Sequence, residues 1–147
     1  MLERVRANAP NAELKGFSVE PMFERHGAVE VIIGASAHGD FGPVILFGEG
    51  GTAVEALADT ALELPPLNDK LARELMERTR IFRRLRGYRD VPPVDLDGLS
   101  SALVRVSRLL LDCSEIVELD ANPVLARPSG IIALDARIRL GREASPR

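Results

Sequence analysis

The residues best suited to chemistry lie near the end of the chain, where Glu118, Asp120 and Asn122 recur at every second position. On an extended strand, residues two apart share a face, so these three oxygen-bearing side chains point to the same side. A returning strand supplies Asp135, and a hairpin would bring it close to that face. Carboxylate and amide oxygens suit Mg²⁺, which keeps several waters and shares nucleotide phosphates. The pattern is typical of a magnesium site, and equally of an edge strand with solvated acids.

A glycine-rich segment, Gly48-Glu49-Gly50-Gly51, follows an apolar run. Glycine allows a ligand to approach the backbone closely, and free N–H groups at the start of a helix bind phosphates. The segment lacks the Lys-Ser/Thr ending of a Walker A loop and is not a GxGxxG fingerprint. A glycine turn that leads into a helix explains the same residues, so both interpretations stay open.

Two acids near the start of the chain are candidates for nucleotide contacts. Glu20, Pro21 and Met22 end a predicted extended segment whose unpaired backbone groups could read a purine edge. Glu30, on the next predicted strand, could bind a ribose hydroxyl. The alternative is a hairpin that carries surface acids.

Arginine is concentrated in one stretch of the chain. Cations in the last turns of a helix complement its dipole, which favours a structural role, although Arg86 or Arg89 could bind phosphates of CoA or a nucleotide. His26 and His38 lie in predicted turns, and we interpret both as surface residues. The arginines of this stretch are Arg78, Arg80, Arg83, Arg84, Arg86 and Arg89.

The elements that must position these residues are short and alternate in type, which predicts an α/β (α+β) fold with a largely antiparallel sheet. We expect a helix remnant or linker over residues 1–14, one folded domain over 15–140 and a loose tail over 141–147. Asn68 is expected to begin one helix and Asp95 or Asp97 the next, and turns are expected at Asn122-Pro123 and Ser129-Gly130. Apolar periodicity predicts one helix from Gly51 through Asp59, one from Asn68 through Leu85, and strands at Lys15–Met22, Val29–Ala37, Val44–Phe47, Leu62–Leu64, Glu115–Asn122 and Ile131–Leu140.

Composition excludes several classes of protein. The 147 residues are 46% hydrophobic and 28% charged, with a net charge of −3, so a broadly basic nucleic-acid surface is not expected. No apolar run has the length that a membrane span requires. Cys113 is the only cysteine, which suits a reducing compartment and predicts a cytoplasmic protein.

An ordered series of motifs resembles the ATP-grasp domain of the ADP-forming acetate–CoA ligases, also found in bacterial protein acetyltransferase fusions. The resemblance runs from about Glu13 to Leu140. The order of these motifs along the chain is more specific to the family than any single motif. The matching motifs are Phe17-Ser18-Val19-Glu20-Pro21-Met22, Glu30-Val31-Ile32-Ile33-Gly34, Asp40-Phe41-Gly42-Pro43, Phe47-Gly48-Glu49-Gly50-Gly51, Pro66-Leu67, Gly87-Tyr88-Arg89, Glu118-Leu119-Asp120-Ala121-Asn122-Pro123 and Leu134-Asp135-Ala136-Arg137-Ile138.

This resemblance implies ATP and Mg²⁺ as cofactors and assigns roles to individual residues. Glu20 and Met22 would form the adenine-contacting hinge and Glu30 would contact ribose. The glycine loop, Gly50 and Gly51 in particular, would lie near the phosphates. Members of the family move a phosphoryl group between a nucleotide and a histidine on another domain, which then serves acyl-CoA formation. The metal residues implied are Asn122 and Asp135, with Asp120 beside them.

The sequence also departs from the family. Its first lobe, with a phosphate-contacting lysine, is expected before Glu13 and is not part of this sequence. Asp90 replaces the glycine that usually follows Gly-Tyr-Arg, and Gly39-Asp40 replaces the usual Asp-Pro. The expected partners are therefore that lobe and a CoA-binding, phosphohistidine-bearing domain, and a homo-oligomer is possible. We expect the chain alone to be inactive as an acid–thiol ligase. The alternatives are a non-catalytic ligand-sensing or dimerising module of a protein acetyltransferase, and a remnant that merely folds.

Overall fold

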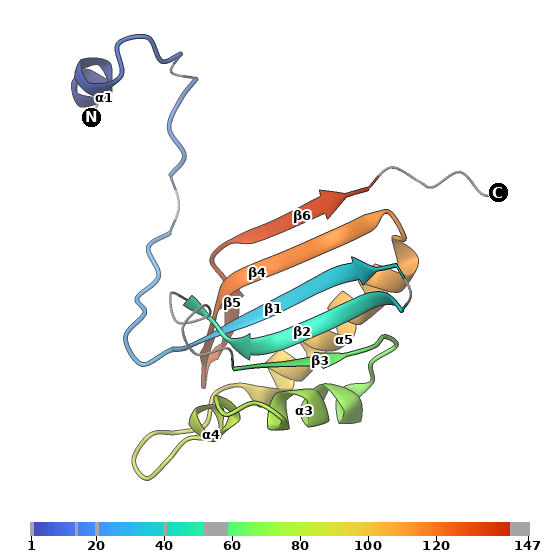
Figure 1. Cartoon of the computed structure of the whole chain (residues 1–147). Coiled ribbons are helices and arrows are strands. Elements are labelled where there is room, and N and C mark those ends of the chain that lie inside the picture. Colours follow the sequence, from blue (N-terminus) through green and yellow to red (C-terminus); the bar gives the residue numbers. More distant parts are fainter. Residues whose placement is uncertain (1, 14, 20, 40, 52–58, 142–147) are drawn as a thin grey trace, which may run out of the picture.

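A six-stranded sheet forms the centre of the molecule in the computed structural model, which describes residues 2–13, 15–19, 21–39, 41–51 and 59–141 (Figure 1). The strand order is β3-β2-β1-β4-β5, with β6 also paired to β4, and every pairing is antiparallel. This confirms the predicted mixed α/β class with a largely antiparallel sheet. The strands are β1 (Val29–His38), β2 (Gly42–Glu49), β3 (Thr60–Glu63), β4 (Ile116–Arg127), β5 (Gly130–Ala133) and β6 (Ala136–Leu140).

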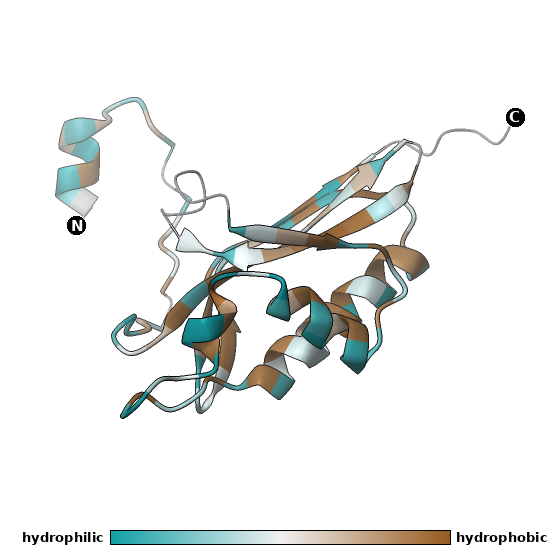
Figure 2. Ribbon diagram, turned by 60° about the horizontal axis from the view of Figure 1, so that its bottom comes forward, coloured by the Kyte–Doolittle hydropathy of each residue, from teal (hydrophilic) through white to brown (hydrophobic). Residues whose placement is uncertain are grey.

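The hydrophobic core lies between one face of this sheet and two helices, α3 (Asp69–Glu77) and α5 (Leu96–Asp112) (Figure 2). Alternate residues of β1, beginning with Val31 and Ile33, are buried against the helices. Because side chains alternate along a strand, the residues between them point to the opposite face, which we call the outer face. Within the described part of the chain, helices cover only the inner face (Figure 1).

Side chains define where the two long helices begin, as the sequence predicts. Asn68 Oδ1 accepts from the Leu71 N–H at 2.9 Å at the start of α3, and Asp95 Oδ1 accepts from the Gly98 N–H at 2.8 Å at the start of α5. Each bond satisfies an N–H that the first turn of a helix leaves without a backbone partner. None of the described helices combines the length and the hydrophobicity that crossing a membrane requires.

The single helix predicted from Asn68 through Leu85 is wrong, because α3 ends at Glu77 and a separate one-turn helix, α4 (Phe82–Leu85), follows. The cause is Asp59, whose carboxylate accepts from the Arg80 N–H at 2.8 Å and the Ile81 N–H at 2.7 Å. These two N–H groups therefore bind a side chain in place of the preceding helical turn.

One strand predicted near the start of the chain is not formed. Helix α1 (Leu2–Asn8) lies at the end of an extended arm that runs away from the sheet (Figure 1). The strand predicted at Lys15–Met22 is wrong, since its described residues pair with no strand. An extended segment becomes a strand only where a sheet edge supplies its hydrogen-bond partners. The helix predicted from Gly51 through Asp59 falls mostly on residues 52–58, which lie outside the described residues.

The last predicted hairpin is correct in outline and wrong in detail. The turn at Ser129-Gly130 is confirmed, with Arg127 paired to Gly130. The turn predicted at Asn122-Pro123 is wrong, because β4 continues through this cis peptide bond to Arg127. The predicted return strand Ile131–Leu140 is divided at residues 134–135 into β5 and β6, which pair with different halves of β4.

Candidate magnesium and nucleotide site

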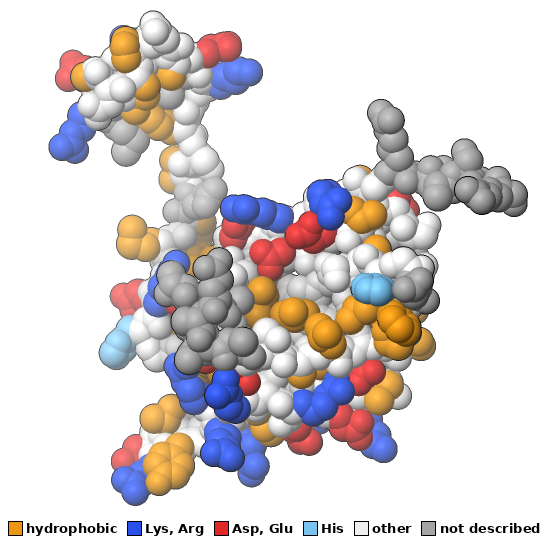
Figure 3. Space-filling model, viewed as in Figure 1, with side chains coloured by type: hydrophobic (Ala, Val, Ile, Leu, Met, Phe, Trp, Pro, Cys, Tyr) orange, Lys and Arg blue, Asp and Glu red, His pale blue; other side chains and the backbone are white. Residues whose placement is uncertain are grey.

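The predicted polar face of β4 lies on the outer face of the sheet. Asp120 is paired with Gly34 of β1 and Glu118 with Ser36, and directly paired residues project to the same side. Gly34 and Ser36 alternate with the core residues Val31, Ile33 and Ala35, so both acids point away from the helices. Acidic and basic side chains gather along this part of the outer face beside an apolar band (Figure 3).

Asn122 lies at an irregularity in β4. Val31 pairs with Val124, while Ile33 pairs with Ala121, so Ile32 alone faces both Asn122 and Pro123. An extra residue in one strand forms a β-bulge, which redirects side chains and often lies next to a functional site. The predicted turn is thus a bulge.

The Asn122 side chain contacts the glycine loop. Its Oδ1 accepts from the Gly51 N–H at 2.8 Å, a bond between residues 71 positions apart in the sequence. Two candidate residues that the sequence places in different motifs, one for the metal and one for the nucleotide, are therefore neighbours.

Asp135 lies directly across from Asn122. The Asn122 N–H donates to the Asp135 carbonyl at 3.2 Å, and the Leu134 N–H donates to the Pro123 carbonyl at 2.9 Å. The Asp135 carboxylate is 54% exposed, and its Oδ2 lies 3.4 Å from Nη2 of Arg137. Asn122 and Asp135 are therefore adjacent along the backbone, as the predicted hairpin requires, although Asp135 lies between β5 and β6 and not on a strand.

Glu30 joins the same group of residues from β1. Its carbonyl accepts from the Gly50 N–H at 2.9 Å, and a Cβ at Gly51 would overlap with its Oε2. Gly51 has φ of +73°, in the region that favours glycine. Glu30 Oε1 also lies 3.4 Å from Nη1 of Arg25, a contact that sequence reasoning missed. The only signal for this contact in the sequence was that Arg25 lies five residues before Glu30, on the other side of a turn.

The hinge residues are placed differently from the rest. Met22 is 96% exposed on the arm that leads into β1, and Glu20 lies outside the described residues. The structure therefore brings together Glu30, Gly50, Gly51, Asn122 and Asp135, with Asp120 one alternation further along β4, but does not bring Met22 against them.

The donor set at this place fits Mg²⁺. Among the described residues, no three His, Cys, Asp or Glu side chains form a ready metal cluster. Mg²⁺ commonly takes only one or two carboxylates, with waters and substrate phosphates completing its shell. An amide oxygen has two lone pairs, so Asn122 Oδ1 can accept from Gly51 and still face a cation. The exposed Asp135 carboxylate supplies the negative charge.

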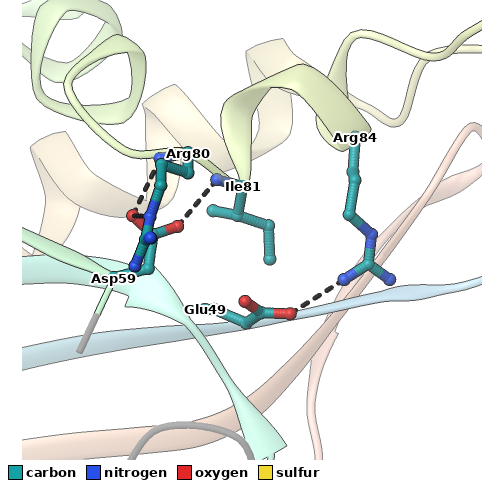
Figure 4. A pocket seen from close by; sticks show the side chains of 5 residues that line it. All are labelled: Glu49, Asp59, Arg80, Ile81 and Arg84. Carbon is teal, nitrogen blue, oxygen red and sulfur yellow. Dashed lines mark hydrogen bonds and ion pairs between the residues drawn. The ribbon is translucent and has the colours of Figure 1, made fainter. Parts of the chain in front are cut away.

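Two arginines of the arginine-rich stretch have a structural explanation (Figure 4). Nη1 of Arg84 donates to Glu49 at 2.8 Å, and Arg80 Nε lies 3.5 Å from the buried Asp59 carboxylate. These residues and Ile81 line a hollow of about 230 Å³. Because both acids are already paired with arginines, the hollow carries little net charge, and the structural role agrees with these contacts for Arg80 and Arg84.

The two histidines remain surface residues. The His38 ring lies 5.3 Å from the Phe41 ring at the exposed end of β1, and His26 is exposed before β1. Neither belongs to the group of residues around Asn122.

The fold and the site define an ATP-grasp protein. The family model described as ATP-grasp domain matches residues 1–140, and the chain belongs to this family. The chain is 38% identical over 97% of its length to acetate–CoA ligase [ADP-forming] I of Archaeoglobus fulgidus, of which it covers 21%. It is 34% identical over 95% of its length to acetate–CoA ligase [ADP-forming] I subunit beta of Pyrococcus furiosus, of which it covers 60%.

A solved structure of the same kind of enzyme is also similar. It is the dinucleotide-forming acetyl-coenzyme A synthetase 1 of Ca. Korarchaeum cryptofilum in complex with coenzyme A and Mg-AMPPCP. The TM-score is 0.74 and the identity 39%, over 77% of this chain and 53% of that chain. The chain thus spans between a fifth and three fifths of these relatives, which are subunits or parts of larger proteins.

Proposed function

We propose that this chain is the Mg²⁺–nucleotide-binding part of an ADP-forming acyl-CoA synthetase of the acetate–CoA ligase type. The observation that carries the proposal is the bond from the Gly51 N–H to Asn122 Oδ1. It joins the glycine loop to the candidate metal residues, where Glu30 adjoins Gly51 and Asp135 adjoins Asn122. A relative that is 39% identical has been solved with Mg-AMPPCP, which supports the same ligand here.

In this proposal Asn122 and Asp135 hold Mg²⁺, and Asp120 lies beside them. The bound ion would neutralise charge on the phosphoryl oxygens, which is a large part of what phosphoryl transfer requires of a protein. Glu30 would accept hydrogen bonds from the ribose hydroxyls, and Glu20 and Met22 would contact adenine.

The two glycines have a role other than donating to phosphate. The Gly50 N–H already donates to Glu30 and the Gly51 N–H to Asn122. We therefore assign Gly50 and Gly51 the role of positioning Glu30 and Asn122 close together. A larger residue would not fit at either place without a shift of its neighbours, because a Cβ would approach Val31 at Gly50, or Glu30 at Gly51, to less than 3.0 Å.

The reaction would transfer a phosphoryl group between ATP and a histidine on another domain, in the cytoplasm. Charge stabilisation in a closed site is usually the largest catalytic contribution, and a closed ATP-grasp site needs a second lobe. The partners would be that lobe and a CoA-binding domain that carries the histidine. The chain alone should then bind Mg²⁺–nucleotide weakly and show no turnover in an ATP/ADP exchange assay.

The binding test uses the whole chain, ADP and Mg²⁺, followed by amide chemical shifts in ¹⁵N NMR spectra. Asp135→Asn should weaken Mg²⁺-dependent ADP binding at least about tenfold, since a charge-assisted contact is worth about 1.5–3 kcal/mol. Its carboxylate is 54% exposed, so the free energy of unfolding should change by less than about 0.5 kcal/mol. Asp112→Asn, an exposed acid at the end of α5, is the control.

Equal ADP affinity in wild type, Asp135→Asn and Asp112→Asn would refute the metal assignment. Binding of ADP that is independent of Mg²⁺, together with dimerisation by light scattering, would favour the ligand-sensing module.

A further inference from the structure

The face of β6 that lies beside the candidate metal residues carries two arginines. Arg137 and Arg139 are two residues apart on β6 and so share a face, and Asp135, just before this strand, forms an ion pair with Arg137. Arg137 is paired with Asp120 across the strands and Arg139 with Glu118. Together with Glu118 and Asp120, these arginines line a hollow of about 260 Å³ on the outer face.

The two arginines are held differently. Arg139 Nε donates to Glu118 Oε2 at 2.8 Å, a well-formed charged hydrogen bond. Arg137 Nη2 lies 3.4 Å from Asp135 Oδ2, a looser ion pair, and its side chain is 81% exposed. Arg137 is therefore the cross-strand partner of one candidate metal residue, Asp120, and the loose ion-pair partner of the other, Asp135.

The charges around Arg137 determine its role. A guanidinium beside Asp135 neutralises this carboxylate, and it also repels a cation that approaches the same oxygens. When Asp135 binds a metal ion, it no longer forms an ion pair with Arg137. A nucleotide brings phosphate oxygens to the same place, and guanidinium groups bind phosphate with two parallel hydrogen bonds.

We propose that Arg137 is a nucleotide-binding residue that changes partner: it neutralises Asp135 in the free protein and binds the nucleotide phosphates in the Mg²⁺–nucleotide complex. The inference rests on the proposed function of the Asn122–Asp135 site. It gives Arg137 opposite effects on two ligands. Arg137 should oppose the binding of a bare divalent cation and favour the binding of the cation with a nucleotide.

The experiment compares Arg137→Gln with Arg139→Gln in the full chain. The control removes the same charge from the same face two residues away. Mn²⁺, followed by electron paramagnetic resonance, is the probe for bare metal, and ADP with Mg²⁺, followed by ¹⁵N NMR, is the probe for the complex. The Arg137 Nε–H resonance should also shift when Mg²⁺–ADP is added, and the Arg139 resonance should not.

Arg137→Gln should tighten Mn²⁺ binding about two- to fivefold, the effect of removing one exposed ion pair. It should weaken Mg²⁺–ADP binding about tenfold or more, as expected for loss of a charged hydrogen bond. Arg139→Gln should tighten Mn²⁺ binding less and leave Mg²⁺–ADP affinity within about twofold, because its charge lies further from Asp135 and is screened.

Two outcomes would overturn the inference in distinguishable ways. If Asp135→Asn abolishes metal-dependent ADP binding but Arg137→Gln behaves like Arg139→Gln, the proposed function stands and Arg137 has no such role. If wild type binds neither Mn²⁺ nor Mg²⁺–ADP at millimolar concentrations, the proposed function fails and the inference fails with it.

Discussion

Replacing Gly50 with alanine should destabilise the protein more than the same change at Gly51, although Gly51 has the unusual backbone. A Cβ on Gly50 would lie closer than 3.0 Å to both the carbonyl carbon and the carbonyl oxygen of Val31. Val31 is completely buried in the central strand β1, so its backbone cannot move aside without disturbing the core. Overpacking of this kind costs about 1–3 kcal/mol and occasionally more, and we expect Gly50→Ala to lie at the upper end.

Gly51→Ala meets a softer obstacle. The nearest atom to its Cβ is Oε2 of Glu30, at the end of a flexible side chain that is 26% exposed and can rotate away. The left-handed backbone costs alanine about 1–2 kcal/mol, and the restricted unfolded chain returns about 0.4–1 kcal/mol. The net loss of stability should be about 1 kcal/mol, but the displaced Glu30 should weaken binding of a nucleotide.

Urea denaturation of both variants measures these differences, with Gly34→Ala as the control. A Cβ on Gly34 would have its nearest neighbour at 3.6 Å, an ordinary contact, so alanine should be neutral or stabilising by up to about 1 kcal/mol. In thermal melts, each kcal/mol corresponds to about 3–4 °C for a chain of this size. The reasoning is refuted if Gly50→Ala is no less stable than Gly34→Ala, or if Gly51→Ala loses more stability than Gly50→Ala.

Two further predictions concern buried hydrogen bonds that organise the helices. Ser107→Ala should lower the free energy of unfolding by about 1–3 kcal/mol, because the Leu67 N–H, which donates to Ser107 Oγ at 2.8 Å, loses its acceptor. Ser101→Ala, at an exposed position of the same helix, should change it by less than about 0.5 kcal/mol, and equal effects in urea denaturation would contradict the assignment. Asp59→Asn should cost about 2–3 kcal/mol, since one charged acceptor of the Arg80 and Ile81 N–H groups becomes an amide. Normal protection of the Ile81 amide from hydrogen exchange in this variant would show that the carboxylate does not hold α4.

Helix starts and most strands of the sheet were predictable, because capping and apolar alternation both involve residues close in sequence. Asn68 and Asp95 each bond to an N–H three residues ahead, a contact that any chain with these residues can form locally. The alternation along β1 and β4 likewise marks one apolar and one mixed face. The prediction failed at Lys15–Met22, where the local pattern is that of a strand but the described residues pair with no neighbouring strand.

The candidate site was likewise predictable from the sequence only in part. The sequence by itself determined that Asp120 and Asn122 are two positions apart on one strand. It also determined that Gly50 and Gly51 come directly after a different strand. Only the tertiary structure decided that the Asn122 side chain contacts Gly51, because the two residues are 71 positions apart and the pairing of the strands brings them together. The break between α3 and α4 has the same origin, since the distant carboxylate of Asp59 binds N–H groups that local periodicity had assigned to one continuous helix. Alternation and capping are short-range and are encoded residue by residue, whereas the partner of a side chain across the sheet depends on strand register, which the whole fold determines.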